Sequence, residues 1–322
     1  MKAAVKRTPD TPPGYGDFPE PVAGEGREIV ELAAAGVHPI VRSLAEGHHY
    51  GSTGTWPLIP GVDAVARTPS GTLVYTGYVE APYGTLAERM AVPATMQLPL
   101  PQGAEPARIA GGLNPGLASW MPLQSRVGEA GTLGTVVVLG ATGMAGMLAV
   151  QNASLLGAAQ IVGVGRDPAG LERAAQTGAT PVALTGDRET DAAALAAAFD
   201  GRPSSLILDF VWGPPAEAMF AALARRGLRE DSADIAYVQI GAAAGPEASV
   251  PAALLRSRRI QIRGSGAGSA PIAAIIAQLP AYMQLIADGR VHIPTRTFPL
   301  SHIADAGNTA QDSGPRVVIV PG

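Results

Sequence analysis

The chain has 322 residues, enough for about two domains of ordinary size. It contains no cysteine, which excludes disulfides and cysteine-ligated zinc or iron–sulfur sites, and its net charge of −4 disfavours general nucleic-acid binding. Lys2 and Lys6 are the only lysines, so neither a P-loop lysine nor a Tyr-x-x-x-Lys dyad is expected.

The first 118 residues are rich in proline and glycine and carry short apolar stretches between turn signals. Strands are predicted at 62–67, 72–79 and 88–92. The piece at 84–90 is ambiguous, and only 26–36 and 106–113 show a helical spacing of apolar residues. This part of the chain therefore predicts a β-rich domain.

From about residue 130, strands and helices alternate at regular spacing. Strands are predicted at 135–139, 161–164, 181–184, 206–210, 236–240 and 260–263. Helices are predicted near 144–157, 168–177, 190–199 and 215–226. Apolar strands without alternation indicate a sheet buried on both faces, and the β–α order indicates parallel right-handed crossovers. We therefore expect a doubly wound dinucleotide-type domain over 119–267.

The last part, 268–322, opens with a helical stretch at 271–290 that Pro280 interrupts, and closes with a predicted strand at 316–320. These residues are too few for a domain of their own. We expect them to complete the N-terminal domain, 1–118. The predicted fold class is α/β, with a doubly wound parallel-sheet domain and a second, mainly β domain.

The strongest local signal is an apolar strand that runs directly into a glycine-rich turn and then a helix, at 135–158. Glycines suit a tight turn, a close approach of backbone to a pyrophosphate and a helix packed on a strand. The first amides of the helix then face the phosphates. The predicted phosphate-binding residues are Ala141, Thr142, Gly143, Met144, Ala145 and Gly146. The alternative is a glycine-rich turn in a domain that binds nothing.

The end of the second strand predicts the cofactor. An NAD-binding domain would place an acidic residue there for the ribose 2′-hydroxyl, but here Gly165 is followed by Arg166. A guanidinium suits a 2′-phosphate, so NADPH is preferred to NADH. Asp167 could take the acidic role if the register differs by two residues, and Arg166 could also be a solvated turn arginine.

Several segments together resemble the medium-chain dehydrogenase/reductases, in the zinc-free quinone oxidoreductase and enoyl reductase branch. They are PLIPGVD (57–63), APYGTLAERMAVPA (81–94), the glycine turn, and 205–242 from SLILDFVWGPPAEA to YVQIGA. The resemblance implies a GroES-like domain formed by the N-terminal part and the tail, and a Rossmann domain, with the active site in the cleft between them. It also implies NADPH, a quinone or α,β-unsaturated carbonyl substrate, and frequent homodimers that pair sheet edges, here near 258–264.

Zinc-dependent relatives carry Gly-His-Glu where this chain has Gly61-Val62-Asp63, and a ligand cysteine where it has His38. Adjacent His48 and His49 point apart in an extended chain, so they are awkward joint ligands for a metal. No metal is therefore expected.

The resemblance also implies catalytic residues. His38 stands in Val-His-Pro where the branch has Val-Asn-Pro, and is a candidate donor or proton source for the substrate oxygen. Tyr50 matches a catalytic tyrosine before a glycine if the loop has one extra residue. Asn114 precedes Pro115 as in the branch, while Leu117 replaces a threonine. The alternatives are a hydrogen-bonded structural histidine and a tyrosine that lines the cleft.

As the resemblance implies, three further loops are expected to lie near the cofactor, after the fourth, fifth and sixth strands of the doubly wound domain. Their predicted cofactor-binding residues are Phe210, Val211, Trp212, Gly241, Ala242 and Gly266. Trp212 is expected to narrow the pocket. The alternative for the loop around Gly266 is a flexible hinge.

The sequence thus predicts a zinc-free oxidoreductase that transfers hydride from NADPH to a quinone or an α,β-unsaturated carbonyl. The alternatives are an NADPH-binding redox sensor with little turnover and a non-catalytic structural partner. No run of 18 apolar residues predicts a membrane span, and no signal peptide is evident, so a cytoplasmic protein without membrane or nucleic-acid partners is expected.

Overall fold

The computed structural model describes residues 1–199, 204–228, 230–309 and 314–322. Its contacts divide the chain into two compact units. Unit 1 is Met1–Pro115 with Gln278–Gly322, and unit 2 is Gly116–Ala277. The divides fall inside helices α2 (Pro106–Ala130) and α8 (Ile272–Ala287). The boundaries predicted from the sequence, at 118/119 and 267/268, fall three residues after the first of these divides and ten residues before the second.

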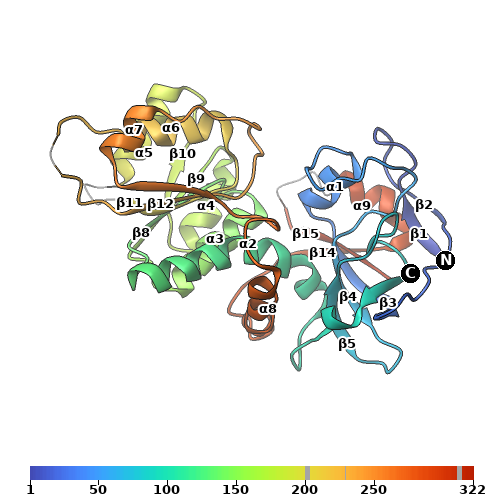
Figure 1. The fold of residues 1–322 in the computed structure, drawn as a ribbon. Helices are drawn as coiled ribbons and strands as arrows, with labels where there is room; N and C mark the ends of the chain where they lie inside the picture. The colour runs from blue at the N-terminus through green and yellow to red at the C-terminus, as the bar shows by residue number, and fades with distance from the viewer. Residues whose placement is uncertain (200–203, 229, 310–313) are drawn as a thin grey trace. The chain divides into compact units, whose positions relative to one another are not determined.

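Unit 2 is built on a six-stranded sheet with the order β10-β9-β8-β11-β12-β13, in which every pairing is parallel (Figure 1). The strands are β8 (Thr135–Leu139), β9 (Gln160–Gly165), β10 (Thr180–Ala183), β11 (Ser204–Asp209), β12 (Ile235–Gln239) and β13 (Ile260–Gly264). The chain runs outward from β8 to β10 and then returns to β11 on the other side of β8. This reversal is the switch point at which doubly wound sheets bind ligands.

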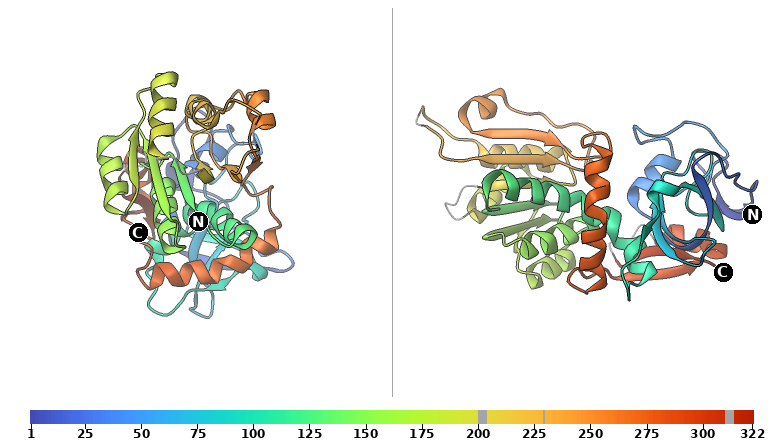
Figure 2. Two further views of the ribbon diagram at one scale, coloured as in Figure 1. Left: turned by 90° about the vertical axis from the view of Figure 1, so that its left-hand side faces the viewer. Right: turned by 60° about the horizontal axis from the view of Figure 1, so that its bottom comes forward.

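Helices cover both faces of this sheet (Figure 2). They are α2, α3 (Met144–Leu155), α4 (Pro168–Gln176), α5 (Arg188–Ala198), α6 (Gly213–Leu223) and α7 (Ala252–Ser257). Val137 packs in one hydrophobic core with Leu195 of α5 and Phe220 of α6, while Val136 packs in a second core with Ala149 of α3. Neighbouring residues of one strand thus enter different cores, which explains why the strands are apolar without alternation.

Unit 1 contains a mainly antiparallel seven-stranded sheet with the order β14-β15-β3-β4-β5-β7, to which β6 adds by pairing with β3. Its strands are β3 (Arg27–Gly36), β4 (Asp63–Arg67), β5 (Leu73–Gly77), β6 (Arg89–Pro93), β7 (Leu98–Pro99), β14 (Thr295–Pro299) and β15 (Arg316–Val320). The C-terminal strand β15 pairs with β3, so the tail completes the sheet of the N-terminal part, as predicted.

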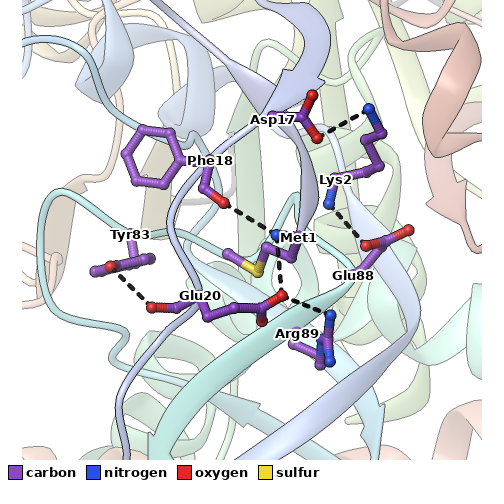
Figure 3. Close-up of polar contacts among 8 residues, drawn as sticks. All are labelled: Met1, Lys2, Asp17, Phe18, Glu20, Tyr83, Glu88 and Arg89. Carbon is purple, nitrogen blue, oxygen red and sulfur yellow. Dashed lines mark hydrogen bonds and ion pairs between the residues drawn. The ribbon is translucent and has the colours of Figure 1, made fainter.

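A separate hairpin of β1 (Lys2–Val5) and β2 (Gly14–Asp17) packs in the same unit. Figure 3 shows how Met1, the residue before β1, is held. The Met1 ammonium donates to the carbonyl of Phe18 at 3.0 Å and pairs with Glu20 at 3.0 Å. Arg89 of β6 pairs with the same Glu20 carboxylate at 2.7 Å. Glu20 therefore ties the start of β1 to the larger sheet.

The expectation of a helix at 26–36 is wrong, because this segment forms strand β3. Its alanines favour a helix locally. In the fold, however, β3 pairs with β4, β6 and β15, and Val30 and Leu32 are buried while Glu31 between them is exposed. Pairing with several strands outweighs the local preference.

Several helices were not expected, or were expected to be shorter. Helix α2 runs far beyond the predicted 106–113, through Pro115 and Pro122, where local rules place the end of a helix. A side chain at Gly112 would overlap Ile293, so glycine lets α2 pack closely in unit 1. The other unexpected helices are α1 (Pro39–Ala45), α7, the 3-10 turns η1 (Ala94–Met96) and η2 (Leu300–His302), and α9 (Ile303–Thr309).

Candidate functional site

The glycine turn after β8 has the geometry of a phosphate cradle. Gly140 takes a positive φ of 92°, and its amide and that of Ala141 both donate to the carbonyl of Val164 at 2.9 Å, which fixes the turn to the end of β9. A Cβ at Gly146 would overlap the backbone of Gly140 and Ala141, so only glycine lets α3 pack this closely.

The middle glycine of the turn, Gly143, leaves open space at the N-terminus of α3. Gly143 is the N-cap of α3 and makes no side-chain cap bond, and a Cβ built on it would meet no atom nearer than the Gly140 carbonyl oxygen at 3.7 Å. The amides of Met144, Ala145 and Gly146 belong to the first turn of α3, where amides have no partner within the helix. The turn can thus accept an anionic group against these amides.

The two candidate ribose-binding residues after β9, Arg166 and Asp167, differ in their contacts. Asp167 is the N-cap of α4: its carboxylate accepts from the Gly170 amide at 2.9 Å and lies 3.6 Å from Arg173. Arg166 is exposed, and no described residue hydrogen-bonds to it or pairs with it. The acidic side chain is therefore engaged within its own helix, while the guanidinium is available to an anionic ligand.

The neighbouring positions of this corner require small residues. A Cβ at Gly165 would overlap the methyl group of Thr142, and one at Gly170 would lie 2.6 Å from the Cβ of Thr142. Glycine at both positions therefore brings Thr142 of the turn against the end of β9 and the start of α4.

The loops after β11 and β12 are adjacent because the two strands are paired. The amides of Val211 and Trp212 donate to one oxygen of Asp209 at 2.8 Å each. A Cβ at Gly241 would lie 2.6 Å from the carbonyl oxygen of Phe210. These contacts bring four predicted residues to the carboxyl ends of the strands, where the glycine turn also lies: Phe210, Val211, Trp212 and Gly241.

Two predicted residues lie further out on these loops. Ala242 is exposed, and its carbonyl accepts from the Gly245 amide at 3.3 Å. Gly266 is exposed in the loop after β13, where its amide donates to the Ser269 hydroxyl at 2.7 Å. No described contact connects Gly266 with the glycine turn, so its cofactor role stays a prediction.

Unit 1 holds a buried polar cluster that sequence reasoning predicted only in part. Asp63 of β4 accepts from the Tyr75 hydroxyl at 2.8 Å and from the Asn114 amide at 3.4 Å, and it lies 3.7 Å from Nε2 of His38. Burial and the neighbouring Asp63 carboxylate raise the pKa of Tyr75 well above its ordinary value. His38 and Asn114 therefore meet at Asp63. Sequence reasoning missed both Asp63 and Tyr75 as members of this cluster.

His38 is almost completely enclosed, with 2% of its surface exposed. Within the described part of the chain, neither ring nitrogen has a hydrogen-bond partner. Its ring occupies the space beside Gly36, where a Cβ would overlap it. Nearby, Arg316 of β15 donates to the carbonyl of Val37 at 3.3 Å, and burial, with the positive charge of Arg42, lowers the Arg316 pKa to about 10.

Tyr50 lies apart from this cluster in its contacts. It is 79% exposed and follows α1, with its ring stacked on His49 at a centroid distance of 4.0 Å. The His49 ring is held in turn by the amide of Gly51, which donates to Nδ1 at 3.0 Å. The phenol is open to solvent, whereas the imidazole of His38 is not.

No set of three or more histidine, cysteine, aspartate or glutamate side chains in the described ranges is arranged to hold a metal ion. His48 is exposed and lies 3.6 Å from Glu46, whereas His38 is buried beside Asp63. That the protein works without a metal stays a prediction.

The sequence is similar to known dehydrogenases and quinone reductases. The family model described as "Zinc-binding dehydrogenase" matches residues 145–288. A probable NADPH-dependent quinone reductase of Emericella nidulans is 28% identical, with each chain covered over its full length.

Among solved structures, the quinone oxidoreductase of Thermus thermophilus, described with its NADPH complex, is 25% identical, with a TM-score of 0.78 over 99% of this chain and 100% of that one. A quinone oxidoreductase of Pseudomonas syringae pv. tomato shares the fold at 19% identity, with a TM-score of 0.81 and full coverage of both chains. These matches and the two sheets confirm the predicted fold class. These similarities support the family expected from the sequence, the medium-chain dehydrogenase/reductases, in their quinone oxidoreductase branch.

Proposed function

We propose that this protein is an NADPH-dependent oxidoreductase that reduces a quinone or another α,β-unsaturated carbonyl compound without zinc. The quinone reductase of Emericella nidulans and the quinone oxidoreductase of Thermus thermophilus support the cofactor and the quinone. The extension to α,β-unsaturated carbonyls rests on the family resemblance in the sequence.

One observation supports the cofactor most directly: the pair of side chains that ends β9. Asp167, which would hold a ribose hydroxyl in an NAD-binding protein, caps α4 instead, and Arg166 has no partner among the described residues. The space at Gly143 and the first amides of α3 fit a pyrophosphate. The chain thus has groups for both the diphosphate and a 2′-phosphate.

When bound, NADPH supplies the hydride. The chain supplies binding and orientation: Gly143 and the start of α3 receive the diphosphate, and Arg166 receives the 2′-phosphate. Reduction of a quinone to a hydroquinone consumes one proton besides the hydride. Tyr50 is the candidate that can donate it, because its phenol is exposed. Because His38 is buried, we do not expect it to contact the substrate directly.

The first prediction tests this proposal by titration of NADPH and NADH against Arg166→Ala. We expect the variant to bind NADPH at least tenfold more weakly, about 1.4 kcal/mol, and to bind NADH as the wild type does. Arg256→Ala is the matched control, because Arg256 is an exposed arginine on α7 outside the glycine turn. Equal loss of both cofactors would show that Arg166 does not read the 2′-phosphate.

Turnover separates the enzyme from the redox sensor. The observation that favours a sensor is the enclosure of His38, which removes one candidate proton donor from direct contact with substrate. An enzyme oxidises NADPH when quinones or enones are added, whereas a sensor binds NADPH tightly and leaves the whole panel unreduced.

We also propose that the protein is a cytoplasmic homodimer, with a small-molecule substrate and neither nucleic-acid nor membrane partners. Among the strands that the structure describes, β13 pairs only with β12, so its other side is open to pairing with a second copy. No described helix has the length and apolar character needed to cross a bilayer.

A further inference from the structure

Trp212 has a backbone conformation that normally belongs to glycine. Its φ is 54° and its ψ is −160°, and the next residue, Gly213, also has a positive φ of 60°. A side chain at such a φ is strained, and residues other than glycine keep it only where the surroundings impose it. A bulky indole at this position therefore calls for a physical reason.

The surroundings that impose this conformation centre on Asp209, the last residue of β11. One of its carboxylate oxygens accepts from the amides of Val211 and Trp212, and the other accepts from the Tyr237 hydroxyl at 2.5 Å. Asp209 and Tyr237 are both 0% exposed. A buried carboxylate that accepts from three donors thus holds the backbone amide of the strained residue, Trp212.

The loop is also held from both sides. The carbonyl of Val211 accepts from Ala244 at 2.7 Å, which links the loop to the one after β12. On the other side, a Cβ at Gly140 would lie 2.9 Å from a methyl group of Val211, so the loop packs closely against the glycine turn. The residues after β11 therefore have little freedom between the glycine turn after β8 and the loop after β12.

The indole ring is fixed by two edge-to-face contacts. Its centroid lies 5.9 Å from that of Phe220 and 6.2 Å from that of Tyr237. Tyr237 thus acts twice: its hydroxyl holds the Asp209 carboxylate, and its ring supports Trp212. The side chain at the switch point and the carboxylate that shapes its backbone are parts of one assembly.

We propose that Asp209 and Tyr237 are positioning residues for the cofactor site, and that together they hold Trp212 at the edge of the bound nicotinamide cofactor. This inference rests on the proposed function, because it assumes that NADPH binds at the glycine turn. The burial of Asp209 raises the pKa of its carboxyl group, so folding disfavours its charge. A carboxyl group buried at such a cost, and used to impose an unfavourable backbone conformation, indicates a role in the site rather than in stability.

Two substitutions test the pair without removing its packing. Asp209→Asn keeps an oxygen for the two amides but removes the charge, and Tyr237→Phe keeps the ring but removes the donor to Asp209. We expect each to weaken NADPH binding by about five- to tenfold, the scale of one ordinary hydrogen bond. Asp209→Asn should lower the melting temperature little or not at all, because it removes the cost of a buried charge.

The pH profile of NADPH binding distinguishes positioning from a general loss of structure. In the wild type, affinity should fall in acid as Asp209 is protonated. Tyr237 is the titratable side chain that acts on the Asp209 carboxyl, and its hydroxyl favours the charged form. Tyr237→Phe should therefore move the midpoint of this loss to higher pH. Asp209→Asn should remove the part that Asp209 causes and leave only the part caused by protonation of the 2′-phosphate at about pH 6.

Asp191→Asn is the matched control. Asp191 is also a buried carboxylate of unit 2, and it accepts from the amides of Thr185 and Gly186 after β10, away from the switch point. It should leave NADPH affinity and its pH profile unchanged. Wild-type affinity and an unchanged midpoint in both test variants would overturn the inference and leave the proposed function intact. A wild-type protein that binds neither NADPH nor NADH would overturn both.

Discussion

Each unit of this protein contains a buried aspartate that accepts a hydrogen bond from a buried tyrosine. In unit 1 the pair is Asp63 and Tyr75, and in unit 2 it is Asp209 and Tyr237. A buried carboxylate is costly unless donors surround it, and both of these have further donors in Asn114 or in backbone amides. The two pairs therefore fix polar groups at the places where the chain carries its candidate functional residues.

Tyr50 gives the second prediction, at the residue scale. Its exposed phenol makes it the candidate donor to the substrate oxygen, and its ring stacks on His49. Tyr50→Phe keeps the stack and removes the hydroxyl, so we expect steady-state turnover of a quinone to fall about 100-fold with NADPH affinity unchanged. Tyr15→Phe is the control, because Tyr15 is also exposed but lies in strand β2. Wild-type turnover in Tyr50→Phe would assign the proton to another donor.

The sequence identifies the phosphate turn more readily than the buried clusters, for a physical reason. The turn is one continuous segment, so the order of strand, glycines and helix is visible in a single window at 135–158. Asp63 and Tyr75 meet only because β4 and β5 pair with Asp63 opposite Gly77, which places Tyr75 diagonally across from it. Without the register, neither residue stands out from its neighbours, and the same holds for Asp209 and Tyr237.

At the element scale, the contact between α2 and α3 gives the third prediction. Asn152 of α3 is fully buried and donates to the carbonyl of Gly116 at 3.1 Å and to the hydroxyl of Ser119 at 2.9 Å, both in α2. Asn152→Ala removes both hydrogen bonds: the Ser119 hydroxyl loses its donor, while the Gly116 carbonyl still accepts from Ser119 at 3.1 Å. We expect the free energy of unfolding to fall by about 1–3 kcal/mol.

Urea unfolding measures this loss, and Ser154→Ala is its control because Ser154 is exposed on the same helix. The control should change stability by no more than about 0.5 kcal/mol. If both variants unfold at the same urea concentration as the wild type, the buried amide does not hold α2 against α3.

The elements that sequence reasoning predicted well and those it missed differ in what determines them. The elements of unit 2 carry their own apolar patterns, because its central strands are buried on both faces and its helices pack one apolar face on the sheet. In unit 1 the segment 26–36 has the alanines of a helix but pairs with three strands, and only the whole sheet decides its structure. Likewise, α2 continues through Pro115 and Pro122, where local rules predict that a helix ends.

At the scale of the whole molecule, the two aspartate–tyrosine pairs make stability depend on alkaline pH in both units. Burial, together with the neighbouring carboxylate, raises the pKa of Tyr75 and of Tyr237 well above the ordinary value near 10. Above that pH the unfolded chain loses the phenolic protons while the folded chain keeps them. The folded state then binds more protons, so stability is fully present below about pH 10 and falls as the pH rises further.

The fourth prediction follows from this loss of stability above pH 10. Each tyrosine should lower the free energy of unfolding by about 1.4 kcal/mol per pH unit above pH 10. Tyr75→Phe and Tyr237→Phe should each be less stable than the wild type at pH 8, because a buried carboxylate loses a donor, but each should lose less stability between pH 10 and 11. Urea midpoints at pH 8, 10 and 11 measure the slopes. Parallel slopes for the wild type and both variants would mean that the phenols titrate alike in the folded and unfolded chain, and that neither carboxylate faces its tyrosine as the structure describes.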